Sequence, residues 1–142
     1  MKVGLIAGSG RFPILFAEEA KRMGVEVAAM GIKGVTDPAL EAIVGKLRIF
    51  PLGQLQKPID AFKAEGVSQV VMAGKVQHAS LFGGVIPDLR AVKLLARLKD
   101  RRTDTILGAV AQEFQKDGLE LISSATYLQH LLVAKGVLTA RK

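Results

Sequence analysis

The stretch KVGLIAGSGRFP, residues 2–13, decides the fold of this 142-residue chain. A short apolar run ends in Gly8-Ser9-Gly10 and leads to Pro13, which suits the first turn of a helix because the N–H that proline lacks would be unpaired there. Residues 14–23 then place apolar side chains at helical spacing, up to Gly24. The pattern predicts a buried strand, a tight glycine turn and a helix.

The same strand-to-helix order recurs along the chain. Further strands are expected at 25–32, 46–50, 67–74 and 119–124, and further helices at 36–45, 54–66, 88–100, 104–118 and 126–136. Short apolar strands alternating with helices form a parallel sheet covered on both faces. We therefore predict an α/β fold: a Rossmann-like three-layer sandwich with a mainly parallel five-stranded sheet in the order 3-2-1-4-5, forming one domain over residues 1–142.

Composition excludes several classes of function. The chain has no cysteine, which removes disulfides, thiolate catalysis and cysteine-bound metals. Its net charge of +7 suits an anionic partner, but with 5% aromatic residues and no Trp it lacks a base-stacking platform, so no nucleic acid is expected. No leader peptide and no 20-residue apolar run is visible, which favours a cytoplasmic protein.

Two loops follow strands whose carboxyl ends should meet at one edge of the sheet. Gly8, Ser9 and Gly10 follow the first strand, and Gly74 and Lys75 follow the fourth. Glycines allow backbone N–H groups to approach a phosphate at a helix start. Together the loops predict an anion site, although turn formation alone also explains the glycines.

Other residues refine that site. Arg11 and Lys75 each add a cation, Phe12 lies beside the turn, and His78 in the loop after the fourth strand is placed to touch a ligand. The dinucleotide fingerprint fails, because Pro13 replaces its third glycine and no acid ends the second strand. No metal-ligand spacing is present.

A basic stripe is expected on the helix at 88–100. Arg90, Lys93 and Arg97 are spaced three and four residues apart, which places them on one helix face. The stripe is either a solvated surface or a contact for phosphate or anionic lipid.

Acidic residues flank the same region. Asp88, Asp100 and Asp104 form the acidic cluster with catalytic potential, and helix capping and charge balance are the alternative explanation of Asp100 and Asp104. Thr103 or Asp104 is expected to cap the helix at 104–118, and Asp37 the helix at 36–45.

Four segments in order resemble one family. They are GLIAGSGRFP (4–13), MAGKV (72–76), PDLR (87–90) and DTILGAVAQEFQKDGLELISSATYLQHLLVAKGVLT (104–139), and they are similar to the N-terminal half of LpxI, the UDP-2,3-diacylglucosamine pyrophosphatase family of lipid A synthesis. The resemblance implies a hydrolase that yields UMP and 2,3-diacylglucosamine 1-phosphate with Mg²⁺, acting on a membrane-borne substrate and thus peripheral on the inner membrane.

The resemblance also assigns roles to residues. Gly8, Ser9, Gly10 and Phe12, with Gly74 and Lys75, would line the cleft that faces nucleotide and lipid, and the basic stripe would suit a headgroup or membrane surface. Family members continue into a C-terminal domain that holds the catalytic aspartate, so this chain is expected to lack that residue and any Mg²⁺ site. The alternative is a non-catalytic nucleotide- or anion-binding module; an oxidoreductase domain is disfavoured by Pro13.

Overall fold

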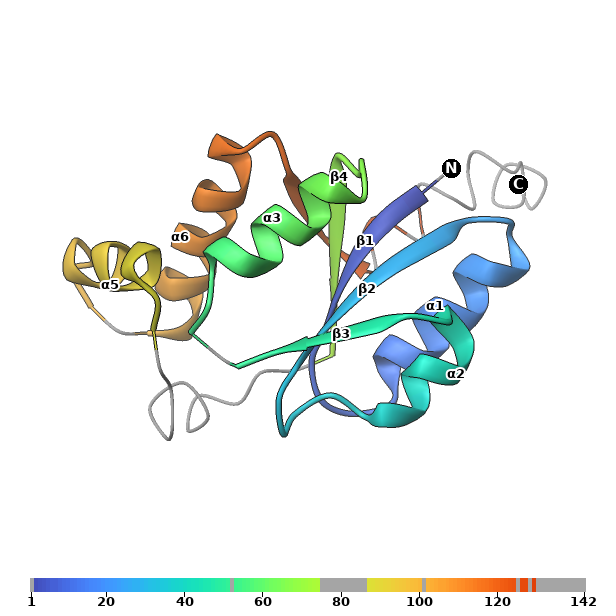
Figure 1. Ribbon diagram of the computed structural model, residues 1–142. Helices are drawn as coiled ribbons and strands as arrows, with labels where there is room; N and C mark the ends of the chain where they lie inside the picture. Colours follow the sequence, from blue (N-terminus) through green and yellow to red (C-terminus); the bar gives the residue numbers. More distant parts are fainter. Residues whose placement is uncertain are drawn as a thin grey trace.

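A computed structural model describes residues 2–51, 53–74, 87–100, 102–124, 126–127 and 129 of the chain (Figure 1). In chain order its elements are β1 (Lys2–Ala7), α1 (Phe12–Arg22), β2 (Glu26–Ile32), the 3-10 helix η1 (Pro38–Leu40), α2 (Glu41–Val44), β3 (Leu47–Phe50), α3 (Gln56–Ala64), β4 (Gln69–Ala73), α5 (Leu89–Ala96), α6 (Thr103–Lys116) and β5 (Glu120–Ser123). The predicted alternation of strands and helices is confirmed from β1 to β5, whereas the expected helix at 126–136 lies largely outside the described residues.

The sheet has five parallel strands in the order β3-β2-β1-β4-β5, as predicted. The central strand β1 pairs with β2 from Lys2↔Glu26 onward and with β4 from Gly4↔Val70 onward. All five strands therefore end at the same edge, and the order changes direction between β1 and β4. That switch point is where open α/β sheets bind ligands.

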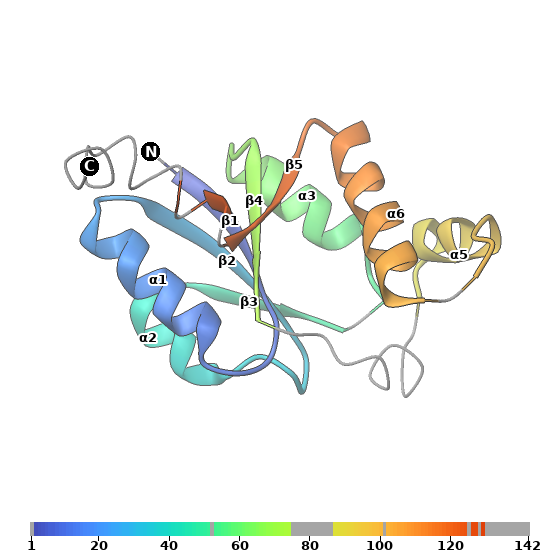
Figure 2. The ribbon, with the colours of Figure 1, turned by 180° about the vertical axis from the view of Figure 1, so that it is seen from behind.

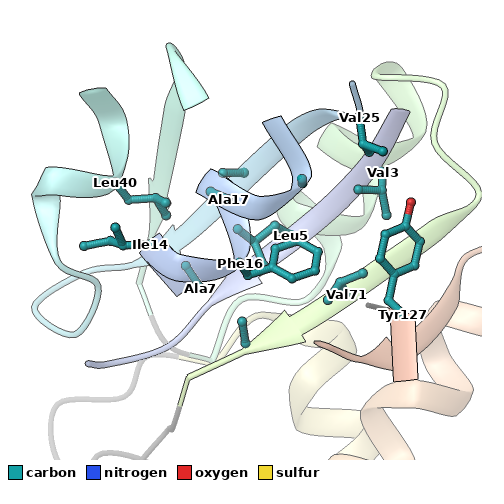
Figure 3. Packing of buried hydrophobic residues seen from close by; sticks show 13 residues of the cluster. Val3, Leu5, Ala7, Ile14, Phe16, Ala17, Val25, Leu40, Val71 and Tyr127 are labelled. Atoms are coloured by element: carbon teal, nitrogen blue, oxygen red, sulfur yellow. The ribbon is translucent and has the colours of Figure 1, made fainter. Parts of the chain in front are cut away.

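Helices cover both faces of the sheet. Figures 1 and 2 show α1 and α2 on one side and α3, α5 and α6 on the other. On the first side Phe16 and Leu5 are fully buried, and the Phe16 ring lies 5.9 Å from that of Tyr127 (Figure 3). On the second, Phe62 and Phe114 pack with ring centroids 6.3 Å apart. Burial of these rings stabilises the three layers.

Helix ends differ from the sequence expectation in two places. Helix α5 ends at Ala96, short of residue 100. Arg102 stands at the start of α6 and makes no side-chain cap, so the expectation that Thr103 or Asp104 caps this helix is wrong. Asp100 instead accepts a hydrogen bond from the Arg102 N–H at 2.9 Å and so orders the turn. The expected cap Asp37 is confirmed by its bond from the Ala39 N–H.

Candidate functional site

The loops after β1 and β4 touch at the carboxyl edge of the sheet. The Gly8 N–H donates to the Ala73 carbonyl at 2.8 Å. Gly74 has a φ of +88°, and a Cβ there would lie 2.7 Å from the Ser9 carbonyl oxygen. The topology thus brings Gly8, Ser9, Gly10, Arg11 and Gly74 together, and we name these five residues the glycine cradle.

The open side of the cradle is at Gly10. Gly10 is exposed, has a φ of +88°, and leaves no atom within 4 Å of a Cβ position. Arg11 beside it is exposed and starts α1 without a side-chain cap. The first N–H groups of a helix have no partner inside the helix and carry the positive end of its dipole. The arrangement can hold an anionic group through backbone N–H donors and one guanidinium.

Thr36, in the loop after β2, hydrogen-bonds to the end of β1 next to the cradle, and the sequence analysis did not predict this role. Its hydroxyl donates to the Ala7 carbonyl at 2.7 Å and accepts from the Ile32 N–H at 2.7 Å. The bond joins the loop after β2 to the last residue of β1. No motif marks Thr36, because its partner is 29 residues away and is met only through strand pairing.

An apolar patch borders the cradle on α1. Phe12 and Leu15 lie on its first turn with 43% and 50% of their surface exposed. Exposed apolar side chains next to an anion site are suited to a ligand that is itself part apolar.

Two expected site residues, Lys75 and His78, lie outside the described residues. Among the residues that the structure describes, no group of three or more His, Cys, Asp or Glu side chains is placed to hold a metal ion. The described side chains therefore do not fit a Mg²⁺ site, and we derive no step through the metal.

The basic stripe of α5 is divided between two environments. Arg90 is turned into the α5–α6 interface, with 17% of its side chain exposed. It donates to Glu113 Oε1 and to Asp117 Oδ1, each at 2.9 Å. Arg97 donates to Glu113 Oε2 at 2.8 Å. Arg90 and Arg97 thus face carboxylates that α6 brings against α5, which helical spacing alone does not show.

The resulting ion-pair cluster has shifted pKa values. Lys116, Arg90 and Arg97 hold the pKa of Glu113 down at about 2. Arg90 likewise lowers the pKa of Asp117, and hydrogen bonding to Asp117 and Glu113 raises that of Arg90. Mutual bonding of this kind is expected of a structural cluster.

Lys93, the remaining member of the stripe, is exposed, and no ion pair joins it to a described carboxylate. Leu89 and Val92 beside it on α5 are 70% and 46% exposed. The outward side of α5 therefore combines apolar side chains with a cation. Within the described part of the chain, none of the helices has the length and apolar character needed to cross a membrane.

Asp88 joins two helices, a role that the sequence analysis did not assign to it. One carboxylate oxygen caps α5 by accepting from the Ala91 N–H at 2.8 Å. The other accepts from the N–H groups of Leu55 and Gln56, each at 2.8 Å, at the start of α3. Both oxygens are used by backbone donors, so Asp88 is a structural residue.

Comparisons with known proteins identify the family of this chain. A sequence model of the LpxI N-terminal domain matches residues 2–131. The UDP-2,3-diacylglucosamine pyrophosphatase LpxI of Caulobacter vibrioides is 31% identical over 138 residues, which cover 95% of this chain and 48% of the relative. The chain spans about half the length of that curated relative. It belongs to the LpxI N-terminal domain family.

Proposed function

We propose that this domain binds the substrate in a UDP-2,3-diacylglucosamine pyrophosphatase of lipid A biosynthesis. The relative that covers almost the whole chain carries that activity in its name. The observation that carries the proposal is the glycine cradle, an exposed glycine turn that leads into α1 at the switch point of the sheet. The full reaction would release UMP and 2,3-diacylglucosamine 1-phosphate.

The cradle would hold the diphosphate. Backbone N–H groups at the start of α1 and the Arg11 guanidinium supply donors and positive charge. Phe12 and Leu15, exposed beside them, supply an apolar wall for the lipid part. The hydrogen-bond donors would complement the diphosphate of the substrate, and the apolar surface would complement its acyl chains.

The hydrolytic step would use groups outside the described residues. A water oxygen forms a bond to phosphorus, the bond from that phosphorus to the bridging oxygen breaks, and the water proton passes to a base. In the family that the chain resembles, the catalytic aspartate lies in a C-terminal domain, so the base would come from that domain. This domain would contribute binding and orientation.

Binding at the cradle is tested by Gly10→Ala against Gly24→Ala. Both glycines have a positive φ, of +88° and +80°, with open space at the Cβ position, so both variants carry a similar backbone penalty. Gly24 follows α1 at the opposite end from the cradle. We expect Gly10→Ala to weaken UDP binding tenfold or more in titration calorimetry, and Gly24→Ala to leave it unchanged. Equal affinities, or tighter binding of NADH than of UDP, would refute the proposal.

We also propose that α5 is the contact with the inner membrane of a cytoplasmic, peripheral protein. Leu89, Val92 and Lys93 give it exposed apolar side chains beside a cation. Lys93→Glu should reduce binding to anionic vesicles, most clearly at low salt. The matched control is Lys57→Glu on α3, also exposed. Equal loss in both variants would point to net charge alone.

A further inference from the structure

A second concave site lies at the opposite, amino edge of the sheet. It is a groove of about 300 Å³ that opens between the first residues of β2, the end of α1 and the segment from α2 into β3. This volume is at the lower end of the range for small-molecule sites. Its lining residues include Ala17, Val25, Val27, Ala29, Ile43 and Val44.

Strand pairing explains why the groove exists. β2 pairs with β1 from Glu26 onward, but β3 joins β2 only from Ala29↔Leu47. Glu26–Ala28 therefore have a neighbouring strand on one side only. The late entry of β3 leaves Val27 of β2 only partly buried, and Ile43 and Val44 of α2, also partly buried, line the same groove.

The groove carries a surplus of positive charge. Its charged lining consists of Lys2, Lys21, Lys46, Arg48, Glu26 and Glu65. Lys2 is engaged by Glu65 at 2.6 Å and by Glu26 at 3.7 Å. No described carboxylate lies within 4 Å of Lys21, Lys46 or Arg48, although Glu65 attracts Lys46 and Arg48 from further away. Four cations against two carboxylates leave the described lining net positive.

We propose that this groove binds a single-chain amphiphile with a carboxylate head. The aliphatic chain would lie on Val27, Ile43 and Val44, which are partly exposed, and burial of their apolar surface supplies the affinity. The head would meet Lys46 and Arg48, which share Glu65 as an acidic neighbour in a lining that is net positive. The inference is independent of the proposed function, because groove and cradle lie at opposite edges of the sheet.

The test measures the binding of three probes to the 142-residue chain by titration calorimetry and by changes in the amide NMR chemical shifts. Dodecanoate below its micellar concentration has chain and acidic head, acetate has the head alone, and dodecyltrimethylammonium has the chain with a cationic head. We expect saturable binding of dodecanoate with shifts confined to the groove residues. Acetate should not bind, and the cationic probe should bind at least tenfold more weakly.

Two variants complete the design. The double variant K46E/R48E should weaken dodecanoate binding at least tenfold, whereas K57E/K99E, with the same charge change at two exposed lysines outside the groove, should bind as the parent does. Thermal unfolding checks that each variant is folded. Equal binding of both dodecyl probes, shifts outside the groove, or no saturable binding would each overturn the proposal. The NMR shifts of the unsubstituted protein test the proposal even if K46E/R48E does not fold.

Discussion

Gly74 is the point at which the two loops of the cradle meet. Its φ of +88° is a conformation that side chains with a Cβ rarely adopt, and three atoms of the neighbouring segment lie within 3.0 Å of the Cβ position. Two of them belong to the backbone of Gly8 and Ser9, which cannot move aside as a flexible side chain would. A glycine is therefore required there whether or not a ligand binds.

Gly74→Ala should lower the free energy of unfolding by about 3 kcal/mol, the sum of a left-handed backbone penalty and overpacking. The control is Gly66→Ala, which has a φ of +75° but open space at the Cβ, and should cost only about 1 kcal/mol. Urea unfolding measures both. Similar losses would show that the two loops do not pack as closely as described.

Individual residues differ in how far the sequence predicts them. The glycines of the cradle could be placed because a turn after a buried strand constrains the backbone locally. Arg90 could not, because its partners Glu113 and Asp117 come from α6, and helical spacing shows which residues share a face but not what that face meets. Thr36 was missed for the same reason, since its acceptor is on another strand.

At the scale of elements, Asp88 holds the starts of α3 and α5 together through three backbone N–H groups. Asp88→Ala should therefore cost about 2 to 3 kcal/mol, more than loss of an ordinary cap. Asp37→Ala removes a cap bond to a single exposed N–H and should cost about 1 kcal/mol or less. Urea denaturation compares the two; equal costs would mean that the link to α3 contributes nothing.

The stabilisation that the ion pairs between α5 and α6 provide should decrease at acid pH. The pKa of Glu113 falls from an ordinary 4.5 to about 2 in the folded protein, so its charge stabilises the fold fully above pH 4.5. This contribution, on the order of 2 kcal/mol, is lost as the pH falls from 4.5 towards 2. Glu113→Gln should be destabilised at pH 7 and approach the parent near pH 2.

The control for that experiment is Glu18→Gln, which removes the same charge from an exposed position on α1. Urea midpoints at pH 7, 4 and 2 are the measurement. A constant difference between parent and Glu113→Gln across these pH values would contradict the proposed origin of the stabilisation.

At the scale of the whole molecule, the sequence predicted the sheet and its strand order correctly. Each βαβ unit is short, apolar and bounded by glycines, and right-handed crossovers leave few topologies. Helix ends were less predictable: α5 stops at Ala96 although the helical pattern continues, and Arg102 stands where a capping side chain was expected. The groove could not be predicted, since it depends on where β3 joins β2.

The proposed division of labour predicts binding without turnover. The 142-residue chain should bind UDP at the cradle but release no UMP from UDP-2,3-diacylglucosamine with Mg²⁺, because the domain would supply orientation alone. Phosphorus NMR follows the reaction, and the longer relative from Caulobacter vibrioides is the positive control. Release of UMP at a rate similar to that of the relative would place the catalytic groups within this chain.

The central position of β1 has a consequence for biosynthesis. The ribosome makes β1 before the other four strands. β2 can then pair with one side of β1, and β3 with β2, but the other side of β1 waits for β4, since Gly4 pairs with Val70. Until then the nascent chain exposes an unpaired apolar edge, which is a template for aggregation. The interval between synthesis of β3 and β4 is thus when this protein most needs a chaperone.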